Sequence, residues 1–407
     1  MQNNTTLSLQ DALSPEHITN PYPVYHRLRS TDPVLWDEQM NCWILTRYYD
    51  VVPGLRDQRF SAARFLLDTT WFPAEMQSTL SPAALALTRQ MLFLDPPDHT
   101  RLRGLVARAF TPRVLEALRP RIQNIADTLL DATQANGRMD VMHDFAYPLP
   151  AIVIAEMLGV PPEDRDQFFQ WTGSFGLLLG GNNPSVETVL QALHDVVDFI
   201  AYFRKIIEQH RSNPRDDLMQ AMITAEEQGD RLSEEELLGN CILLLAAGHG
   251  TTTHLIGNGL LALLQHSNQL EDLKHNPSMI SLAVMELLRF DGPVQITSRV
   301  ASANLGIGGK RIKAGDEVIF HLGAASRDPA QFAEPDQLNL SRQENRHLAF
   351  GQGIHFCLGA PLARIEAEIA FNTLLRRLQA PQLETAELEW NKSLVFRGTR
   401  AIPITFT

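Results

Sequence analysis

The chain is poor in cysteine, in positive charge and in long apolar runs, and each shortage excludes a class of protein. Its 407 residues include three cysteines, Cys42, Cys241 and Cys357. They are too few and too scattered for a disulfide framework, and no C-x-x-C pair suggests structural zinc. The formal net charge of -12 argues against nucleic acid as a partner, because phosphate binding needs clustered lysine and arginine.

Hydrophobic segments long enough for a membrane are also missing. No uncharged apolar run reaches the roughly 20 residues that a bilayer span needs, and the longest candidate, 241–264, is interrupted by glycine, threonine and histidine. Residues 1–11 are polar and lack the basic and apolar regions of a signal peptide. We therefore expect a cytoplasmic, monomeric protein without a membrane partner.

Most of the chain is predicted to be helical. Apolar spacing of three and four residues predicts helices over 114–135, 143–159, 162–180, 186–211 and 216–229. Strands are expected in a hairpin over 33–47, in the region 293–320 and in an extended tail over 394–406. Since there is no internal repeat and no Gly/Ser linker, residues 1–407 are predicted to form one domain, mainly α with small β-sheets (α+β).

One further helix is expected to dominate the interior. Ser233 followed by Glu236 is a capping box, and the helix that it starts can run to about His266. That is roughly 33 residues, or about 50 Å at 1.5 Å per residue, enough to cross the whole molecule. Because the segment is apolar nearly all round, it is predicted to be buried.

The most informative segment surrounds Cys357, in the run FGQGIHFCLGAPLAR over 350–364. Glycines at 351 and 353 allow a tight turn and a close approach to a neighbour, and Pro361 starts a helix just beyond the cysteine. A cysteine at a helix N-terminus is stabilised as a thiolate, and a thiolate on haem iron favours O–O cleavage. On these residues alone, a buried structural cysteine and a nucleophilic cysteine stay open as alternatives.

This run resembles the haem-binding loop of bacterial cytochrome P450 enzymes, whose pattern is F-G-x-G-x-H-x-C-x-G-x-x-L-A-R. The nine specified positions are matched by Phe350, Gly351, Gly353, His355, Cys357, Gly359, Leu362, Ala363 and Arg364. The resemblance covers nearly the whole chain. It implies the cytochrome P450 fold, a triangular prism with a long central helix crossing above the haem, and it implies haem b with Cys357 as the axial ligand.

Other sequence motifs of the same family also occur in this chain. Glu286 and Arg289 resemble the E-x-x-R pair, which by resemblance is a folding element with Arg342 near its third partner. The run 95–103 resembles D-P-P-x-H-x-x-x-R, and haem propionates need cations or imidazoles. By resemblance, the residues expected to contact the cofactor are His99, Arg103, Ala247, Gly248, Arg299, Phe350, His355 and Gly359.

The predicted long helix contains a departure from the family. Residues 247–252 align with the oxygen-binding motif A/G-G-x-D/E-T, in which a threonine stabilises bound peroxide and an acid beside it helps to deliver protons. Thr251 matches the threonine, whereas Gly250 occupies the place of the acid. We take Thr251, Gly250 and Thr252 as the catalytic positions.

Two histidines near Gly250 are possible replacements for the missing acid. At about 100° per residue around the helix, His249 lies about 160° from Thr251, whereas His254 lies about 60° from Thr251. His254 is therefore the better polar substitute. Delivery of protons by water is the alternative. Glycines at 248, 250 and 257 each cost roughly 1 kcal/mol in a helix interior, which predicts a kink or a groove.

The resemblance implies an oxygen-activating monooxygenase that hydroxylates or epoxidises a bulky hydrophobic small molecule. The general pattern is most similar to enzymes that tailor polyketides and related secondary metabolites. Gly250 leaves an atypical outcome open, such as desaturation or ring formation, and a haem sensor or carrier without turnover is a further alternative. An apolar wall is expected from Phe65, Leu66, Leu67, Trp71, Phe72 and Met76.

The electron supply is expected to come from other proteins. No length remains for a fused flavin or iron–sulfur module, so the resemblance implies a separate ferredoxin and ferredoxin reductase. A local basic patch would suit an acidic partner, and its expected members are Arg101, Arg108, Arg113, Arg346 and Arg364. The apolar, glycine-rich segment 175–184 is a candidate for a mobile lid.

Overall fold

The computed structural model divides into two units, each assembled from several stretches of the chain. It describes residues 7–64, 74–161, 164, 167, 168, 171, 173, 174, 176, 185–215, 217–227 and 232–407. The first unit comprises Met1–Arg64, Gly257–Cys357 and Thr385–Arg400, and the second comprises Phe65–Ile256, Leu358–Glu384 and Ala401–Thr407. The chain changes unit inside its longest helix, after Ile256, and again directly after Cys357.

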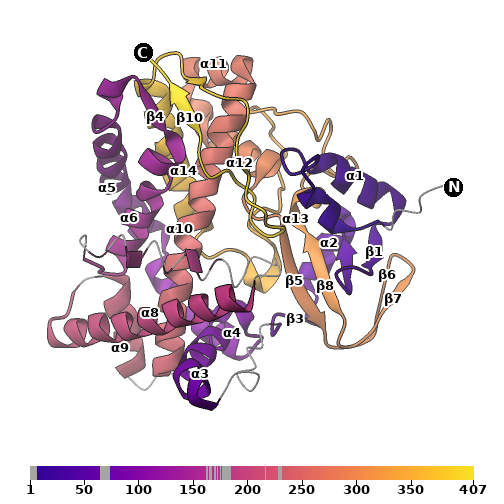
Figure 1. The fold of residues 1–407 in the computed structure, drawn as a ribbon, viewed down its shortest axis with the longest axis vertical. Helices are drawn as coiled ribbons and strands as arrows, with labels where there is room; N and C mark the ends of the chain where they lie inside the picture. The colour runs from indigo at the N-terminus through magenta and orange to yellow at the C-terminus, as the bar shows by residue number, and fades with distance from the viewer. Residues whose placement is uncertain are drawn as a thin grey trace. The chain divides into compact units, whose positions relative to one another are not determined.

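The first unit is built on a five-stranded sheet with the strand order β1-β2-β8-β5-β3 (Figure 1). Its strands are β1 (Val34–Asp37), β2 (Cys42–Leu45), β3 (Phe60–Ser61), β5 (Ile296–Ala301) and β8 (Glu317–His321). β1 and β2 form the predicted hairpin, and β2 pairs with β8 in parallel. A separate ribbon pairs β6 (Leu305–Ile307) with β7 (Lys310–Ile312).

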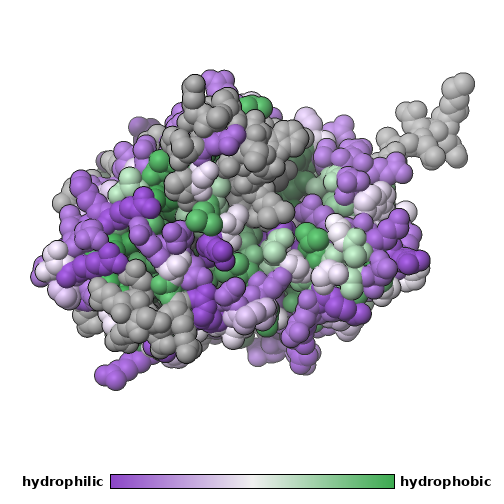
Figure 2. All heavy atoms as spheres, turned by 90° about the horizontal axis from the view of Figure 1, so that it is seen from below, coloured by the Kyte–Doolittle hydropathy of each residue, from purple (hydrophilic) through white to green (hydrophobic). Residues whose placement is uncertain are grey.

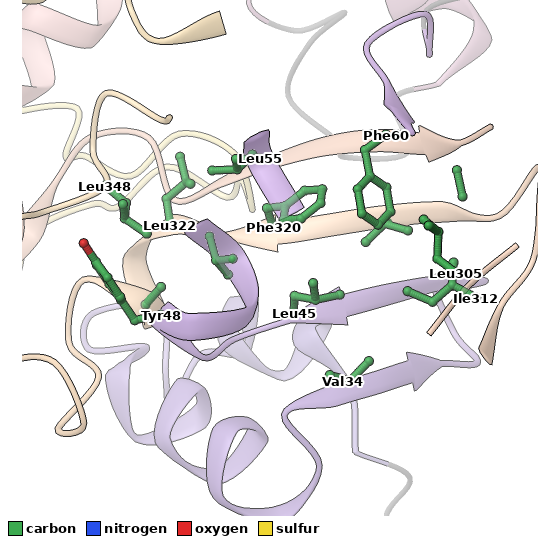
Figure 3. Packing of buried hydrophobic residues seen from close by; sticks show 14 of the residues in the cluster. Val34, Leu45, Tyr48, Leu55, Phe60, Leu305, Ile312, Phe320, Leu322 and Leu348 are labelled. Atoms are coloured by element: carbon green, nitrogen blue, oxygen red, sulfur yellow. The ribbon is translucent and has the colours of Figure 1, made fainter. Parts of the chain in front are cut away.

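The first unit also contains helices and an apolar cluster beside the sheet. The helices are α1 (Tyr22–Thr31), α2 (Tyr48–Arg56), α11 (Ser267–His275), α12 (Ile280–Asp291) and α13 (Leu322–Ala325). Figure 3 shows the cluster, in which Phe60 and Phe320 meet edge to face at 5.2 Å. A Cβ at Gly54 of α2 would lie 2.3 Å from the Phe320 ring, so glycine at this position lets α2 lie directly on the sheet.

The second unit is mainly helical. Its helices are α3 (Ala74–Thr88), α4 (Asp98–Val106), α5 (Pro112–Asp131), α6 (Pro148–Met157), α8 (Val186–Ser212), α9 (Leu218–Glu227) and α14 (Ala360–Arg377). A small sheet joins β4 (Arg138–Asp140), β10 (Pro403–Thr405) and β9 (Gln382–Leu383) in the order β4-β10-β9. The prediction of a mainly helical chain with small sheets is confirmed.

The long helix α10 (Glu234–Gln265) has 32 residues, close to its predicted extent. The capping box is formed as predicted: Glu236 N donates to Ser233 Oγ at 3.2 Å, and Ser233 N donates to Glu236 Oε2 at 2.9 Å. Arg101 of α4 also reaches the Glu236 carboxylate, at 2.6 Å. The start of α10 is therefore fixed by its own cap and by α4.

Some predicted elements have different limits in the structure. The helix expected over 143–159 is a π-helical turn (Met142–Ala146) followed by α6, because Pro148 fits the first turn of an α-helix but not its interior. The tail over 394–406 is regular only in β10, and elsewhere two isolated bridges hold it. Most of the helix predicted over 162–180 lies outside the described residues.

In the part of the chain that the structure describes, no helix is long and apolar enough to cross a membrane. The face in Figure 2 mixes hydrophilic residues with smaller groups of hydrophobic ones.

Candidate active site

The loop before Cys357 makes its turns at Gly351 and Gly353, the two glycines singled out from the sequence. Gly351 and Gly353 have φ of 67° and 75°, values that side chains other than glycine rarely adopt. A Cβ on Gly353 would lie 2.4 Å from the carbonyl oxygen of Leu55, so the backbone approaches α2 as closely as it can. The loop closes where Cys357 N donates to Phe350 O at 2.9 Å.

Cys357 differs from the other two cysteines in its exposure. Cys42 and Cys241 are buried, and burial raises the pKa of Cys42 to about 12 and that of Cys241 further still. Cys357 is exposed and directly precedes α14 along the chain. The alternative of a buried structural cysteine is therefore wrong for Cys357.

Positive charge gathers in the first unit around Arg299 on β5. Arg299 is 5% exposed and donates to Thr297 Oγ1 at 3.1 Å and to Ser298 O at 2.7 Å. Burial and the nearby charge of Arg299 lower the pKa of Arg64 to about 9. Two neighbouring guanidinium groups, of which Arg299 is buried and Arg64 is partly exposed, suit an anionic group such as a propionate. Arg64 was not predicted from the sequence.

The E-x-x-R pair forms a buried network in the first unit, as predicted. Both nitrogens Nε and Nη2 of Arg289 donate to the Glu286 carboxylate at 2.8 Å. Arg342 Nε, the expected third partner, donates at 3.1 Å, and Asn345 adds a contact at 3.0 Å. Arg289 also donates to three backbone carbonyls, those of Ser326, Pro335 and Gln337. The network joins α12 to the loop over 326–345.

In the second unit, the middle of α10 is accessible although its flanks are buried. Residues 237–245 and 255–263 are buried, whereas Ala247 is exposed and Gly250 and Thr251 are partly exposed. The Thr251 hydroxyl donates to the Ala247 carbonyl at 2.8 Å, across one helical turn. Ala247, Gly250 and Thr251 of the aligned motif are therefore accessible, whereas His249 and Thr252 of the same motif are buried.

Two glycines of this segment have different surroundings. A Cβ on Gly248 would lie 3.0 Å from Ile154 Cγ1, so Gly248 allows α6 to pack closely against α10. A Cβ on Gly250 would meet nothing within 4 Å, which leaves room for a larger side chain. The helix is continuous through both positions. The kink or groove expected from the three glycines stays a prediction.

Neither histidine of α10 provides a charged substitute for the missing acid. Burial lowers the pKa of His249 and that of His254 to about 4, so both are neutral near pH 7. His249 is directed away into the core, where its ring meets Tyr147 edge to face at 4.2 Å. His254, the candidate favoured by helical angle, therefore has no proton to supply as an imidazolium.

A carboxyl group that the sequence analysis missed lies beside this segment. Glu366 of α14 is 1% exposed, and its side chain interacts with the Thr252 hydroxyl, itself 3% exposed. Glu366 Oε1 is buried without a hydrogen-bond partner among the described residues. One signal was present in the sequence: Glu366 lies four residues after Leu362 and three before Ile369, on the apolar stripe of its helix.

The remaining predicted residues are placed within their own units. His99 is buried on α4, one turn before Arg103, while Gly359 is the N-cap of α14. Phe350 and His355 lie in the cysteine loop of the first unit. The contacts of these residues with a cofactor stay predictions.

Several expectations about the substrate and partner are limited by the structure. The apolar wall over 65–72 and most of the segment 175–184 lie outside the described residues, as does the side chain of Met76. Arg101, placed in a basic patch from the sequence, forms ion pairs with Asp98 and Glu236 at 3.1 and 2.6 Å. Its charge is therefore partly balanced inside the protein.

The donor groups present fit a haem. The first unit offers an exposed cysteine at Cys357 and the neighbouring cations Arg64 and Arg299. The second unit offers an open stretch of small residues and threonine in α10. Such groups match an iron ligand, a propionate partner and an oxygen site, respectively.

Known proteins resemble this chain over almost its full length. The family model described as Cytochrome P450 matches residues 61–396. The polyketide biosynthesis cytochrome P450 PksS of Bacillus subtilis (strain 168) is 42% identical, over 95% of this chain and 96% of its own. The cytochrome P450 monooxygenase PikC of Streptomyces venezuelae is 41% identical, over 97% of this chain and 92% of its own.

A solved structure extends this similarity to three dimensions. The crystal structure of P450BioI in complex with hexadec-9Z-enoic acid ligated acyl carrier protein has a TM-score of 0.90 and 39% sequence identity. It covers 96% of this chain, which in turn covers 100% of that chain.

Proposed function

The chain belongs to the cytochrome P450 family, and on that basis we propose that it uses haem b to oxidise a bulky hydrophobic small molecule. The predicted fold is confirmed, and the protein is a cytochrome P450 monooxygenase whose family implies haem with cysteine-thiolate ligation. One observation carries the proposal for this chain: Cys357, unlike Cys42 and Cys241, presents an exposed thiol on a loop fixed by two glycines of positive φ.

The residues of the cysteine loop and of α4 are proposed to bind the cofactor. Cys357 would hold the iron, and haem supplies the activation of dioxygen when it is bound. His99, Arg103, Arg299 and His355 would hold the propionates by charge-assisted hydrogen bonds. Phe350 and Gly359 would line the cysteine side, while Ala247 and Gly248 would give the cofactor and dioxygen room beside α10.

Thr251 is proposed to orient the oxygen that reacts. Its hydroxyl donates to the Ala247 carbonyl, so its oxygen remains available to accept a further hydrogen bond. Gly250 cannot supply a proton, and Thr252 is turned toward Glu366. The chain's contribution to the chemistry is therefore to hold oxygen, exclude bulk water and provide protons at a defined place.

A polyketide-like secondary metabolite is the proposed substrate class. PksS is named for polyketide biosynthesis, and the P450BioI structure holds a fatty acyl chain on a carrier protein. Both relatives share about 40% of their residues with this chain, which favours a long, apolar substrate. Electrons are proposed to come from a separate ferredoxin and ferredoxin reductase.

The absorption spectrum of the reduced protein with carbon monoxide tests the thiolate ligand. We expect a Soret band shifted far to the red, since a thiolate donates strongly to the iron. Cys357→Ala should lose this shift, whereas Cys42→Ala, which alters a buried cysteine of the same unit, should keep it. A folded, haem-loaded wild-type protein without the shifted band would overturn the proposal.

An atypical outcome, desaturation or ring formation, is a second candidate. The open space at Gly250 favours it, because a carboxyl that fits there is missing and slower protonation alters the fate of the oxidant. Gly250→Glu should then shift the product profile toward hydroxylation and reduce peroxide release. An unchanged profile and unchanged coupling would remove Gly250 as the cause.

A further inference from the structure

A buried histidine of the second unit lies where the ends of three helices meet. His210, in the last turn of α8, is 0% exposed, and its ring Nε2 lies 2.8 Å from Oδ2 of Asp217, which directly precedes α9. Its other ring nitrogen, Nδ1, lies 2.9 Å from the carbonyl oxygen of Ile206. Gly159, just after α6, closes the contact, since a Cβ there would lie 2.5 Å from Asp217 Oδ2 and 2.6 Å from His210 Nε2.

The hydrogen-bond partners of His210 indicate how many protons its ring carries. A backbone carbonyl and a carboxylate accept hydrogen bonds and donate none, so both ring nitrogens of His210 face an acceptor. A neutral imidazole has a proton on one nitrogen, and its other nitrogen would then meet an acceptor without a proton between them. Both contacts are satisfied together when the ring is an imidazolium, with a proton on each nitrogen.

The two helix ends favour a positive His210 and a negative Asp217. His210 is in the last turn of α8, where the partial negative charge of the helix end stabilises a cation. Asp217 Oδ1 accepts a hydrogen bond from Gln220 N at 2.9 Å, so the same carboxylate caps the start of α9, where an anion is favoured. The proton shared by the pair is therefore expected on the histidine and not on Asp217.

Three other histidines show what the carboxylate adds. His194, His266 and His275 also place Nδ1 at 2.8–2.9 Å from the carbonyl oxygen four residues earlier in their helices. None of the three is buried, and among the described residues none has a carboxylate within hydrogen-bond distance of Nε2. The second acceptor and the exclusion of water distinguish His210 from them.

The remaining charged groups around this junction are engaged elsewhere. Residues 218–225 of α9 contain no ionisable side chain. Near the ends of α6 and α8, the described charged side chains donate to a carbonyl or form ion pairs: Arg215 with Gly159 O at 3.1 Å, Arg211 with Glu208 at 2.6 Å and Glu156 with Arg121 at 2.6 Å. Asp217 is therefore the charged group in contact with the His210 ring.

We propose that His210 is a pH-sensitive switch, whose second proton holds the ends of α6, α8 and α9 together and whose loss releases them. With both protons in place, the ring donates to Ile206 O and to Asp217 Oδ2. When solvent removes one proton, Nε2 and the carboxylate become two facing acceptors, and the contact between α8 and α9 opens. The stability from this contact is therefore present at low pH and lost as rising pH deprotonates His210. The switch concerns the fold around α8 and does not depend on the proposed function.

Nitrogen-15 NMR of the full-length, haem-loaded protein with labelled histidine measures the protons on the ring. At pH 7 the His210 ring, identified by the signals that His210→Gln removes, should show two N–H groups that exchange slowly because the ring is buried. The matched control His194→Gln changes a histidine of the same helix that has the same carbonyl contact but is exposed, and it should leave these signals in place. A single N–H on His210 would overturn the proposal.

Hydrogen exchange of backbone amides tests whether loss of the proton opens the contact. Between pH 6 and pH 9, after correction for the intrinsic exchange rate, protection of the amides over 206–212 and 218–222 should fall about tenfold, the effect of losing a charge-assisted hydrogen bond. The amides of α5, in the same unit, should keep their protection. His210→Gln should show low protection over both segments at either pH. Equal protection of the wild type at pH 6 and pH 9 would overturn the proposal.

Asp217→Asn separates a switch from a merely structural contact. Asparagine also caps helices well, and its Nδ2 donates, so it can bond Nε2 of a neutral His210 whose Nδ1 still donates to Ile206 O. This variant should keep its protection at pH 9, where the wild type has lost it, and its His210 ring should show one N–H at pH 7. A variant that loses protection toward pH 9 as the wild type does would contradict the switch. If His210→Gln does not fold, Asp217→Asn decides.

Discussion

Glu286 of α12 and Glu366 of α14 are buried to the same degree, at 0% and 1% exposure, but their surroundings differ completely. Glu286 accepts hydrogen bonds from two guanidinium groups, those of Arg289 and Arg342, and from Asn345. Glu366 has the Thr252 hydroxyl beside it, and its Oε1 is unbonded among the described residues. Burial is equal in the two cases, so burial by itself does not tell an ionised acid from a protonated one.

The number and charge of the donors make the distinction. A carboxylate enclosed by cations is stabilised as an anion and holds two segments of the chain together. A carboxyl that lies beside a single hydroxyl and no cation keeps its proton instead. The difference can be tested by substituting each glutamate in turn.

The largest effect is expected from Glu286→Gln, which leaves the fully buried Arg289 without a carboxylate. Breaking a buried pair in this way costs about 3–5 kcal/mol, which urea unfolding followed by circular dichroism would measure. Glu389→Gln, which removes an acid from the exposed pair with Arg400, is the control and should change stability by less than about 0.5 kcal/mol. A loss below about 1 kcal/mol for Glu286→Gln would contradict the assigned role.

The next effect concerns the pH dependence of stability in Glu366→Gln. The folded protein keeps a proton up to about pH 8 that an ordinary glutamate, with a pKa of 4.5, has already lost. Stability from this group is therefore complete below about pH 4.5 and declines as the pH rises toward 8, by up to about 1.4 kcal/mol per pH unit. Wild type should lose stability relative to Glu366→Gln across this window. Parallel profiles would show that Glu366 is not protonated in the folded state.

A smaller change is expected from Thr252→Val. The Thr252 interaction lowers the pKa of Glu366. In an infrared pH titration, removal of this interaction should therefore move the midpoint at which the carbonyl band of protonated Glu366 fades upward from about 8. Thr253→Val, which removes a hydroxyl from the next position of α10, is the control and should leave the midpoint in place. A downward shift in Thr252→Val would mean that the hydroxyl stabilises the acid form instead.

The smallest effect is expected from Glu368→Gln, which removes an acid whose partner, Arg119, is partly exposed. Solvent weakens such pairs, so the loss of stability should stay within about 1 kcal/mol and should shrink further in high salt. Chemical unfolding at two salt concentrations would measure it. A salt-independent loss as large as that of Glu286→Gln would place Glu368 in the same class as the buried pair.

Local spacing predicted the first of the two buried glutamates but not the second. Glu286 and Arg289 are three residues apart, so helix geometry alone places them together, and the family pattern added Arg342. Glu366 and Thr252 belong to different helices. Helical periodicity identifies an apolar face but not the helix that it meets, so this contact depends on tertiary packing that the sequence does not display.

The same limit applies to His254 and to the tail of the chain. The helical angle favoured His254 as a proton donor, whereas its burial lowers its pKa to about 4. The capping box of α10, the glycine turn before Cys357 and the hairpin β1–β2 were predicted because each depends on neighbouring residues. In the tail, single bridges to Val294 and Trp390 replace the expected extended structure, and such partners cannot be found from local pattern.

The pairing of β2 with β8 also determines when the sheet of the first unit can form while the chain is being synthesised. Trp43 in β2 donates to Asp316, which lies 273 residues further along the chain and immediately before β8. At about 5–20 residues per second, the ribosome adds that stretch in about 14–55 seconds. During this interval β2 has one edge without its partner strand, exposed to other chains or to chaperones. The sheet of the first unit is therefore completed late in translation, after most of the second unit has already been made.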